Sequence, residues 1–491
     1  MSKKILILVL AVGIVMSVAI GGIAFADQAT PVTLTVTLNN YYYPTQYPEF
    51  AKMTEKIVQQ YEALHPNVHI TLIPWIWSNQ TDYETWLTAQ YAAGKEPDIA
   101  WEQYYNRWIE PGWWVSLDKY LEEPDPYAAA GAGKEHWKDA IPEFVWNTTV
   151  APDGKQYSLC LDWAETGLYY NEEIFNKLGI SPNFTSWDQF MQDLKIIKEH
   201  GYIPLDFGMS SSQWSTYQWV DDIFTTAVFA SEVPQMEMPK YNEQYNQYYK
   251  GEEWRDLTPE EIAKAIYDGL YSAYSPQFVE FLKLVKEFSQ YWPNGFASLS
   301  YNDMLSLFAS GKAAMMWYGN WSLPMVTQTV PFKFGVTYIP PFSTQQIPNL
   351  PKIFQDVNFR VGAPTGAAQL GITVGAEKRH VTSWAVDFLK YLSTPYFGTE
   401  ISAAGMYIPL IKDTPVSSAV SAFIKIASYP TRAFMDPIGR FTPTISTEYD
   451  TIMANYLMGT IDMQTAQKQI QNVFNEYLKD MVSQYHYSWY K

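Results

Sequence analysis

The chain has 491 residues, which is too long for one small core and favours two or three domains. Its formal net charge of −18 repels phosphate backbones, so we expect no nucleic acid among its partners. The single cysteine, Cys160, excludes an internal disulfide, and no zinc-ligand pattern surrounds it. Aromatic residues make up 16% of the chain, against 17% for charged residues. Tyr and Trp rings combine an apolar face with a polar group, which suits sugars as well as an aromatic core.

The chain begins with an apolar run that starts at Ile5, directly after Lys3 and Lys4, and ends in a small-x-small sequence at 24–26. This pattern is typical of a secretory signal peptide over residues 1–26. The run is also long enough to stay in the membrane as an uncleaved N-terminal anchor. Both alternatives predict an exported protein, either extracellular or on the cell surface.

Strands and helices alternate in the first part of the body, which favours parallel strand pairing with helices on both faces of the sheet. The apolar periodicity switches between two and about 3.6 residues along this stretch. The predicted elements are a strand at 31–40, a helix at 49–66, a strand at 67–75, a helix at 83–97 and a strand at 98–101.

The alternation returns after residue 150 and is interrupted by a stretch rich in Pro, Gln, Asn and Tyr at 231–257, which we interpret as an insertion. The later predicted strands are at 154–163 and 313–319. The later predicted helices are at 171–179, 186–201, 259–274, 277–292, 301–312, 384–398 and 466–485. In the helix at 186–201, Ser186 is placed to cap the first turn and Gly201 to end the last.

Seven segments, in order, resemble family 1 extracellular solute-binding proteins, the maltose-binding-like sugar receptors of ABC importers. No single motif is specific, but the ordered set spans nearly the whole chain. The segments are FAKMTEKIVQQYEALHPNVHI, AAGKEPDIAW, GWWVSLDKYL, GKQYSLCLDWAETGLYYNEEIFNKLGI, TSWDQFMQDLKIIKEHGYIPL, FASGKAAMMWYGNW and VDFLKYLSTPYFGTEISAAGMYIPL.

The resemblance implies an α/β fold of the periplasmic-binding-protein type II class. In that fold two lobes, each a doubly wound sheet flanked by helices, enclose a ligand cleft. We expect residues 32–162 with 318–372 to form the N-terminal lobe. Residues 163–317 with 373–491 would form the C-terminal lobe and carry the insertion. The strand at 313–319 would cross between the lobes.

A sugar receptor needs flat aromatic faces for the apolar sides of the sugar ring, and carboxylates, amides or arginine for its hydroxyl groups. Both kinds of group recur directly after predicted strands, where the loops of an α/β sheet form ligand crevices. Because each aromatic residue alone is more often core than site, we expect only part of the set to contact ligand. The candidate binding residues are Tyr41, Tyr42, Tyr43, Trp75, Trp77, Trp101, Glu102, Asp162, Trp163, Glu165, Asp206, Trp214, Asn320, Trp321 and Arg360.

The segment FASGKAAMMWYGNW places two tryptophans around a glycine. We expect Trp317 to be buried in the core and Trp321 to face the cleft. Gly319 would let the backbone turn tightly between them.

The sequence therefore predicts a receptor that captures a sugar or oligosaccharide and delivers it to the permease subunits of an ABC importer. We expect a monomer without catalytic residues, metal or other cofactor. His65 and His69 have helical spacing, but Pro66 breaks the helix that would direct both at one ion. The alternative is a secreted glycoside hydrolase, which would need two carboxyl groups about 5–9.5 Å apart.

Overall fold

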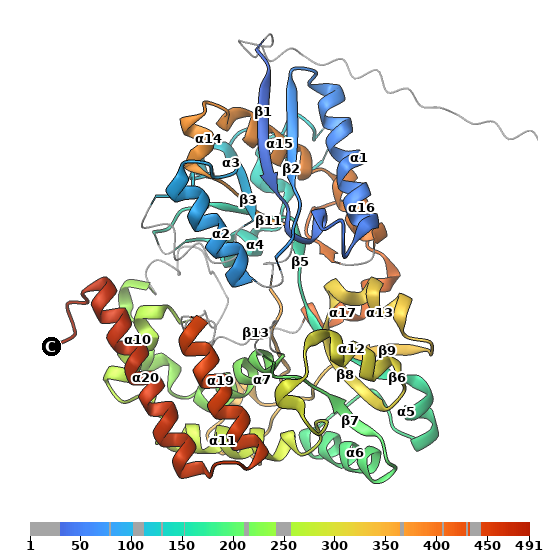
Figure 1. The fold of residues 1–491 in the computed structure, drawn as a ribbon, viewed down its shortest axis with the longest axis vertical. Helices are drawn as coiled ribbons and strands as arrows, with labels where there is room; N and C mark the ends of the chain where they lie inside the picture. Colours follow the sequence, from blue (N-terminus) through green and yellow to red (C-terminus); the bar gives the residue numbers. More distant parts are fainter. Residues whose placement is uncertain are drawn as a thin grey trace, which may run out of the picture.

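The computed structural model describes the chain as two lobes, one above the other in Figure 1, joined by a narrow connection. The residues described are 30–77, 80–101, 112–128, 131–151, 153–210, 216–241, 257–363, 368–404, 407–428, 431–432 and 443–491. The predicted signal peptide or anchor at 1–26 lies outside them. Among these described residues, none of the helices combines the length and the apolar composition needed to cross a bilayer.

The N-terminal lobe is built on a five-stranded sheet with the order β2-β1-β3-β11-β4. Its strands are β1 (Val32–Thr37), β2 (Val68–Ile73), β3 (Ile99–Trp101), β4 (Ser158–Cys160) and β11 (Gln369–Ile372). β1 runs parallel to β2 and β3, as the alternation predicted, whereas β11 is antiparallel to β3 and β4. The flanking helices are α1 (Pro48–Leu64), α2 (Gln80–Ala93), α3 (Asp118–Leu121), α4 (Glu143–Thr149), α14 (Val374–Lys378), α15 (Thr382–Leu392) and α16 (Pro395–Ala404).

The C-terminal lobe is built on a four-stranded sheet with the order β7-β8-β6-β9. Its strands are β6 (Thr166–Asn171), β7 (Ile203–Asp206), β8 (Ala313–Gly319) and β9 (Phe334–Thr337). The helices of this lobe are α5 (Glu172–Leu178), α6 (Trp187–Glu199), α7 (Tyr217–Phe229), α8 (Val233–Met236), α10 (Pro259–Tyr267), α11 (Pro276–Ser289), α12 (Tyr301–Ala309), α13 (Leu323–Thr329), α17 (Ser421–Ala427), α19 (Pro443–Met458) and α20 (Met463–Tyr485).

Local sequence signals account for several helix ends. Ser186 caps α6 by accepting a hydrogen bond from the backbone N–H of Gln189, as predicted. Gly201 follows the end of that helix with a φ of 83°, which glycine adopts without steric cost. In α10, Thr258 and Glu261 form a reciprocal capping box.

The lobes are joined where three stretches of chain run side by side, which we call the hinge ribbon. Its middle stretch, 161–165, contains β5 (Asp162–Trp163). On one edge, Ala164 pairs with Ala363, and the Leu161 N–H donates to the Ala368 carbonyl at 3.0 Å. On the other edge, β5 pairs with β12 (Ile408–Pro409). In Figure 1, β5 and the short strand β13 (Thr431–Arg432), which pairs with β10 (Phe359–Arg360), lie in the gap between the lobes.

The observed division of the chain differs from the predicted domain boundaries in two places. Residues 318–337, predicted to belong to the N-terminal lobe, include β9 and the end of β8, which pair with β6 in the second sheet. β8 therefore does not cross between the lobes. Residues 374–404, predicted for the C-terminal lobe, form helices of which α15 packs on β11 and α16 on α1. In both cases, contacts between residues far apart in the sequence decide which lobe holds the segment. The order of the segments along the chain does not reveal those contacts.

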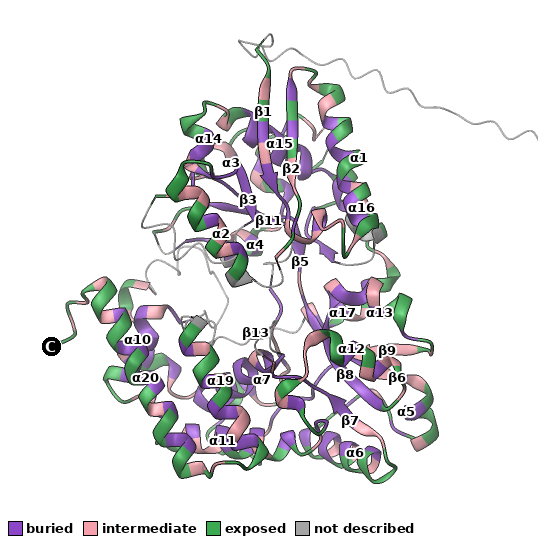
Figure 2. Ribbon diagram, in the orientation of Figure 1, coloured by how far each residue is buried: buried purple, intermediate pink, exposed green. Residues whose placement is uncertain are grey.

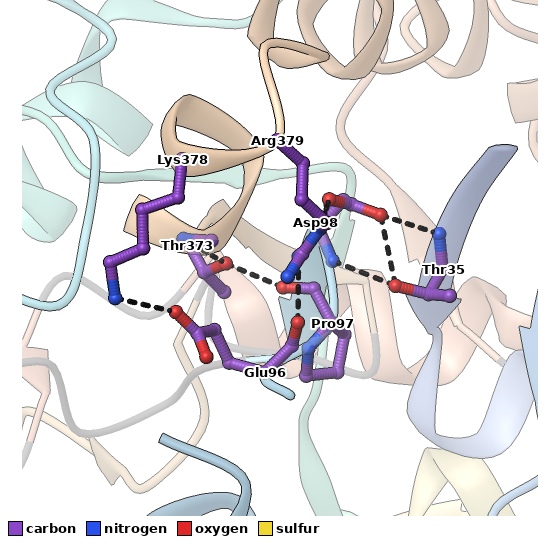
Figure 3. A network of polar contacts seen from close by, with 8 residues as sticks. Thr35, Glu96, Pro97, Asp98, Thr373, Lys378 and Arg379 are labelled. Carbon is purple, nitrogen blue, oxygen red and sulfur yellow. Dashed lines mark hydrogen bonds and ion pairs between the residues drawn. The ribbon is translucent and has the colours of Figure 1, made fainter. Parts of the chain in front are cut away.

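A polar network joins β1, the start of β3 and α14 around the buried Glu96 and Asp98 (Figure 3). The Asp98 carboxylate, which precedes β3, accepts hydrogen bonds from the backbone N–H of Thr35 at 2.7 Å and its hydroxyl at 2.9 Å. The guanidinium of Arg379 pairs with the same carboxylate at 2.7 Å. A Cβ at Gly375 would lie 2.6 Å from Arg379 Nη2 and 2.6 Å from Glu96 Cγ, so a larger residue there would push the guanidinium away from its present path over the start of α14. The network holds β1, β3 and α14 in one register.

Asp206, at the end of β7, is a fully buried carboxyl group inside the C-terminal lobe. Neither oxygen has a hydrogen-bond partner within the described part of the chain. Burial raises the pKa of Asp206 to about 8, and the nearby backbone N–H groups of Phe207 and Phe308 offset only part of that cost. Asp206 is therefore largely protonated at neutral pH.

This burial predicts a specific pH dependence of stability. The pKa of Asp206 is about 8 in the folded chain and about 3.9 in the unfolded chain. Below pH 4 the carboxyl group is protonated in both states and does not lower the free energy of unfolding. As the pH rises towards 8, ionisation favours the unfolded chain and the free energy of unfolding falls. The loss at pH 7 is on the order of 4 kcal/mol. Asp206→Asn should remove this pH-dependent loss, because an amide does not ionise. The variant should therefore gain free energy of unfolding relative to the parent between pH 5 and pH 8.

Urea unfolding at both pH values measures the difference, with Asp480→Asn on the exposed side of α20 as the control. A constant difference between Asp206→Asn and the parent at pH 5 and pH 8 would contradict the prediction.

Candidate functional site

The loops of both sheets that carry the candidate residues converge on the gap between the lobes. β1, β2, β3 and β4 all run in one direction, so their carboxyl ends lie at one edge of the N-terminal sheet. In the C-terminal sheet the parallel pair β7 and β8 ends on the side where the hinge ribbon enters at Thr166, which pairs with Gly319. The two edges therefore face each other across the connection seen in Figure 1.

An aromatic cluster covers the carboxyl ends of β2 and β3, and we call it the N-lobe cluster. Trp75 stacks on Tyr83 of α2, with ring centroids 4.7 Å apart and planes inclined by 29°. It also meets Trp101 edge to face at 5.4 Å. All three rings are buried, and the Tyr83 hydroxyl donates to the Trp101 carbonyl at 2.9 Å. These inner rings therefore support the cluster.

The outer part of the N-lobe cluster is more open. Trp77 is partly exposed and lies 5.0 Å from Trp75 and 4.7 Å from Trp86, measured between ring centroids. Ile76, between the two tryptophans, has 70% of its surface exposed. The arrangement presents a partly exposed indole on a rigid base, which suits the apolar face of a sugar ring.

A second group of rings lies where β8 ends, and we call it the C-lobe cluster. Trp317 is fully buried, as predicted, and its indole N–H donates to the Thr166 hydroxyl at 3.1 Å. Trp321 is partly exposed and meets Trp219 of α7 edge to face at 5.9 Å. Trp219 in turn lies 6.2 Å from Trp317. A buried ring again supports a partly exposed one.

Gly319 has a different role from the one predicted. Its φ is −90°, which any residue can adopt, so the backbone there needs no special freedom. A Cβ at this position would instead lie 2.3 Å from the Trp321 ring. Glycine is required because the indole folds back over its Cα.

The three tyrosines after β1 occupy different environments. Tyr41, in the short 3-10 helix η1 (Asn39–Tyr42), is buried and donates its hydroxyl hydrogen bond to Asp162. Burial is the largest cause of the raised pKa of Tyr41, followed by the Asp162 charge. Tyr42 is half-buried and donates to Glu55 at 3.2 Å. Tyr43 is half-buried and packs against the N-lobe cluster.

The polar candidates at the hinge ribbon are held by internal contacts. The fully buried Asp162 accepts hydrogen bonds from Tyr41 and from the Ala368 N–H, the latter at 3.1 Å. The buried Glu165 carboxylate accepts from the indole N–H of Trp163 at 3.1 Å. The Arg360 guanidinium lies over the Trp163 ring at 4.7 Å from its centroid.

Asn320 completes this group. Its side chain accepts from the Glu165 N–H at 3.1 Å and donates to the Trp163 carbonyl at 3.0 Å. The structure therefore brings Asp162, Trp163, Glu165, Asn320 and Arg360 together at the ribbon.

Three other candidates do not join either group. Asp206 is the last residue of β7 and is fully buried in the interior of the C-terminal lobe. Glu102 and Trp214 lie outside the described residues, so their place at the cleft stays a prediction.

Sequence reasoning missed several rings that complete the clusters. Tyr83 and Trp86 sit three residues apart in the first turns of α2, a spacing that places both on one helix face. Trp219 lies in α7, a helix that the sequence patterns did not predict. Phe144 of α4 lies 5.8 Å from Trp163 and is 39% exposed.

No group of three or more His, Cys, Asp or Glu side chains is placed to bind a metal in the part of the chain that the structure describes. His65 instead contacts the Tyr127 hydroxyl at 2.6 Å and lies 3.5 Å from Asp387. His69 lies 3.0 Å from Glu62.

Comparison with solved structures shows the same fold. A chitin oligosaccharide binding protein aligns with a TM-score of 0.66 and 19% identity, covering 91% of this chain and 99% of the other. A solute-binding protein in complex with raffinose aligns with a TM-score of 0.61 and 17% identity, with the same coverage of 91% and 99%. These likenesses confirm the predicted two-lobed α/β fold.

Sequence comparison extends the likeness. A multiple sugar-binding protein of Streptococcus mutans is 23% identical over 360 residues, or 72% of this chain and 70% of that protein. A putative binding protein of Brucella abortus is 24% identical over 327 residues, or 65% of this chain and 66% of that protein. The model of the bacterial extracellular solute-binding protein family matches residues 44–395. The chain therefore belongs to the family of bacterial extracellular solute-binding proteins.

Proposed function

We propose that this protein binds a sugar or oligosaccharide reversibly between its lobes and delivers it to the permease subunits of an ABC importer. The observation that carries the proposal is the pair of aromatic clusters at the facing strand ends. Each sets a partly exposed indole, Trp77 or Trp321, on buried rings. The related proteins named for multiple sugars, chitin oligosaccharide and raffinose support a carbohydrate ligand.

The described carboxylates of the ribbon favour a receptor over the alternative hydrolase. Glu165 is fully buried and accepts three N–H hydrogen bonds, and Asp162 is fully buried with Tyr41 and Ala368 as partners. A glycosidase needs one carboxyl group that can protonate the leaving oxygen and another that can attack or activate water. Buried carboxylates that already accept internal hydrogen bonds suit a structural role better than this catalytic role. The extracellular family fits an exported receptor, which we propose acts as a monomer.

Isothermal titration calorimetry against a panel of oligosaccharides, peptides and amino acids should show saturable binding of at least one oligosaccharide. Chromatography of the mixture afterwards should recover that sugar intact. Binding of a peptide with no response to any sugar would contradict the carbohydrate assignment, and release of shorter sugars would favour the hydrolase.

Saturating sugar should also bring the lobes together, because ligand held by both clusters selects the closed arrangement. Small-angle X-ray scattering should then report a smaller radius of gyration for the complex than for the free protein. An unchanged radius at saturation would argue against closure.

Trp321→Ala should weaken binding of that sugar about 30-fold, roughly 2 kcal/mol, because a rigid ring stacked on ligand loses little entropy. The folded structure should persist, since the Trp321 ring is partly exposed. The matched control is Trp187→Ala in α6, which removes a buried ring from the core of the same lobe, outside the C-lobe cluster.

That control should cost about 3–5 kcal/mol of stability and leave the affinity of the folded fraction almost unchanged. Melting temperature and affinity are measured for both variants. A Trp321→Ala protein that melts far earlier yet binds normally would refute the role of Trp321 in the cleft.

A further inference from the structure

The Glu165 carboxylate is the point at which the C-terminal end of the hinge ribbon is fastened. Glu165 is fully buried. Its Oε1 accepts from the backbone N–H groups of Thr166 at 3.0 Å and Gly362 at 2.9 Å, and its Oε2 accepts from the Trp163 indole N–H at 3.1 Å. Burial raises its pKa, while the Arg360 charge and these N–H groups oppose that rise. All three partners are donors, which matches the ionised carboxylate.

Gly362 is shaped to receive this carboxylate. A Cβ there would lie 2.4 Å from Glu165 Oε2 and 2.4 Å from the Ala164 carbonyl oxygen. The backbone at Gly362 therefore contacts the Glu165 side chain directly, and no side chain fits between these two stretches of the ribbon. The contact joins residues 197 positions apart in the sequence.

Trp163 is the residue at which contacts from the two lobes meet. From the C-terminal side, Asn320 holds its carbonyl at 3.0 Å and Glu165 holds its indole N–H. From the N-terminal side, Phe144 of α4 lies 5.8 Å from its ring, and Trp163 pairs with Ile408 of β12. The indole ring is thus held by a hydrogen bond to Glu165 and only packs against Phe144.

We infer that Glu165 is a positioning residue rather than a ligand contact: it fastens Gly362 and the Trp163 indole to the C-terminal lobe and so sets the resting angle between the lobes. When the lobes rotate, the Trp163 ring moves with Glu165 and Asn320 and slides against Phe144. The N-terminal end of the same stretch is fastened separately, through Asp162 to Tyr41 and Ala368. The pivot is thereby confined to the short span between the two carboxylates.

The inference rests on the proposed function only in linking the rotation of the lobes to sugar binding, so its test needs no sugar. Spin labels at Lys52→Cys on α1 and Lys195→Cys on α6 report the distance between the lobes, because these side chains are 68% and 66% exposed. The native Cys160 is buried and should stay unlabelled. Pulsed electron paramagnetic resonance on the ligand-free full chain then gives the distribution of that distance.

Glu165→Gln places an amide N–H opposite the Trp163 indole N–H, which then has no acceptor there. The distribution of the distance between the two labels should therefore broaden or shift from that of the parent. Trp163→Phe keeps the carboxylate and an aromatic ring at this position but replaces the indole by a smaller ring without the N–H. It should change the distribution in the same direction by less. The second variant also decides the matter if Glu165→Gln fails to fold.

Glu261→Gln is the matched control. Glu261 is also fully buried and accepts backbone N–H hydrogen bonds, from Thr258 at 2.8 Å and Met238 at 2.6 Å, but it lies in α10 away from the ribbon. Its variant should lose stability and keep the parent distribution. Parent-like distances in both Glu165→Gln and Trp163→Phe, or an equal shift in Glu261→Gln, would overturn the inference. A failure of every sugar to bind would leave these distances, and hence this test, unaffected.

Discussion

Hydrogen bonding along both edges of residues 161–165 is the constraint on which the arrangement of the two lobes depends. A single crossing strand would leave its buried N–H and C=O groups without partners, at a cost comparable to a lost hydrogen bond for each. Ala363 and Ala368 on one edge, and Ile408–Pro409 on the other, supply those partners. The connection is therefore a small sheet rather than a loose linker. Because both larger sheets are entered through it, their strand ends face the same gap.

The aromatic content of the chain follows from the same arrangement. Loops that leave facing strand ends have no sheet behind them, so stacked rings provide the support that a sheet would otherwise give. Trp75, Tyr83 and Trp101 do so in one lobe, and Trp219 with Trp317 in the other. Each aromatic pair adds about 0.5–1.5 kcal/mol beyond its buried area. Figure 2 shows buried residues reaching through both lobes and along β5, so this support is continuous with the cores.

Sequence patterns predicted the elements whose periodicity is simple. The strands β1, β2 and β3 and the helices α1 and α2 were all confirmed. β2 and α1 bury one face and expose the other, whereas β3 is a short apolar run with all three residues buried. Helix α7 was missed because nearly all its residues are buried, including Asp221 and Thr225, so it has no polar face to mark its period.

The candidate site was predictable in position but not in role. Asp162 and Glu165 were correctly placed at a strand end that meets the gap. Their partners Ala368 and Gly362 are 206 and 197 residues further along the chain, and no local pattern announces them. For the same reason the lobe that holds β8 and the lobe that holds α15 could not be assigned from segment order. The binding role of the predicted residues stays a prediction.

The contact between Gly319 and the Trp321 ring couples two positions in the evolution of the protein. A larger residue at 319 is incompatible with the folded-back indole, whereas a smaller residue at 321 would leave position 319 free to vary. Substitutions at this pair must therefore begin at 321. Once a side chain has accumulated at 319, the tryptophan cannot return without first restoring the glycine. The tryptophan at 321 must thus be lost before the glycine at 319. Lineages that have replaced both residues can regain the indole only by reversing these substitutions in the opposite order.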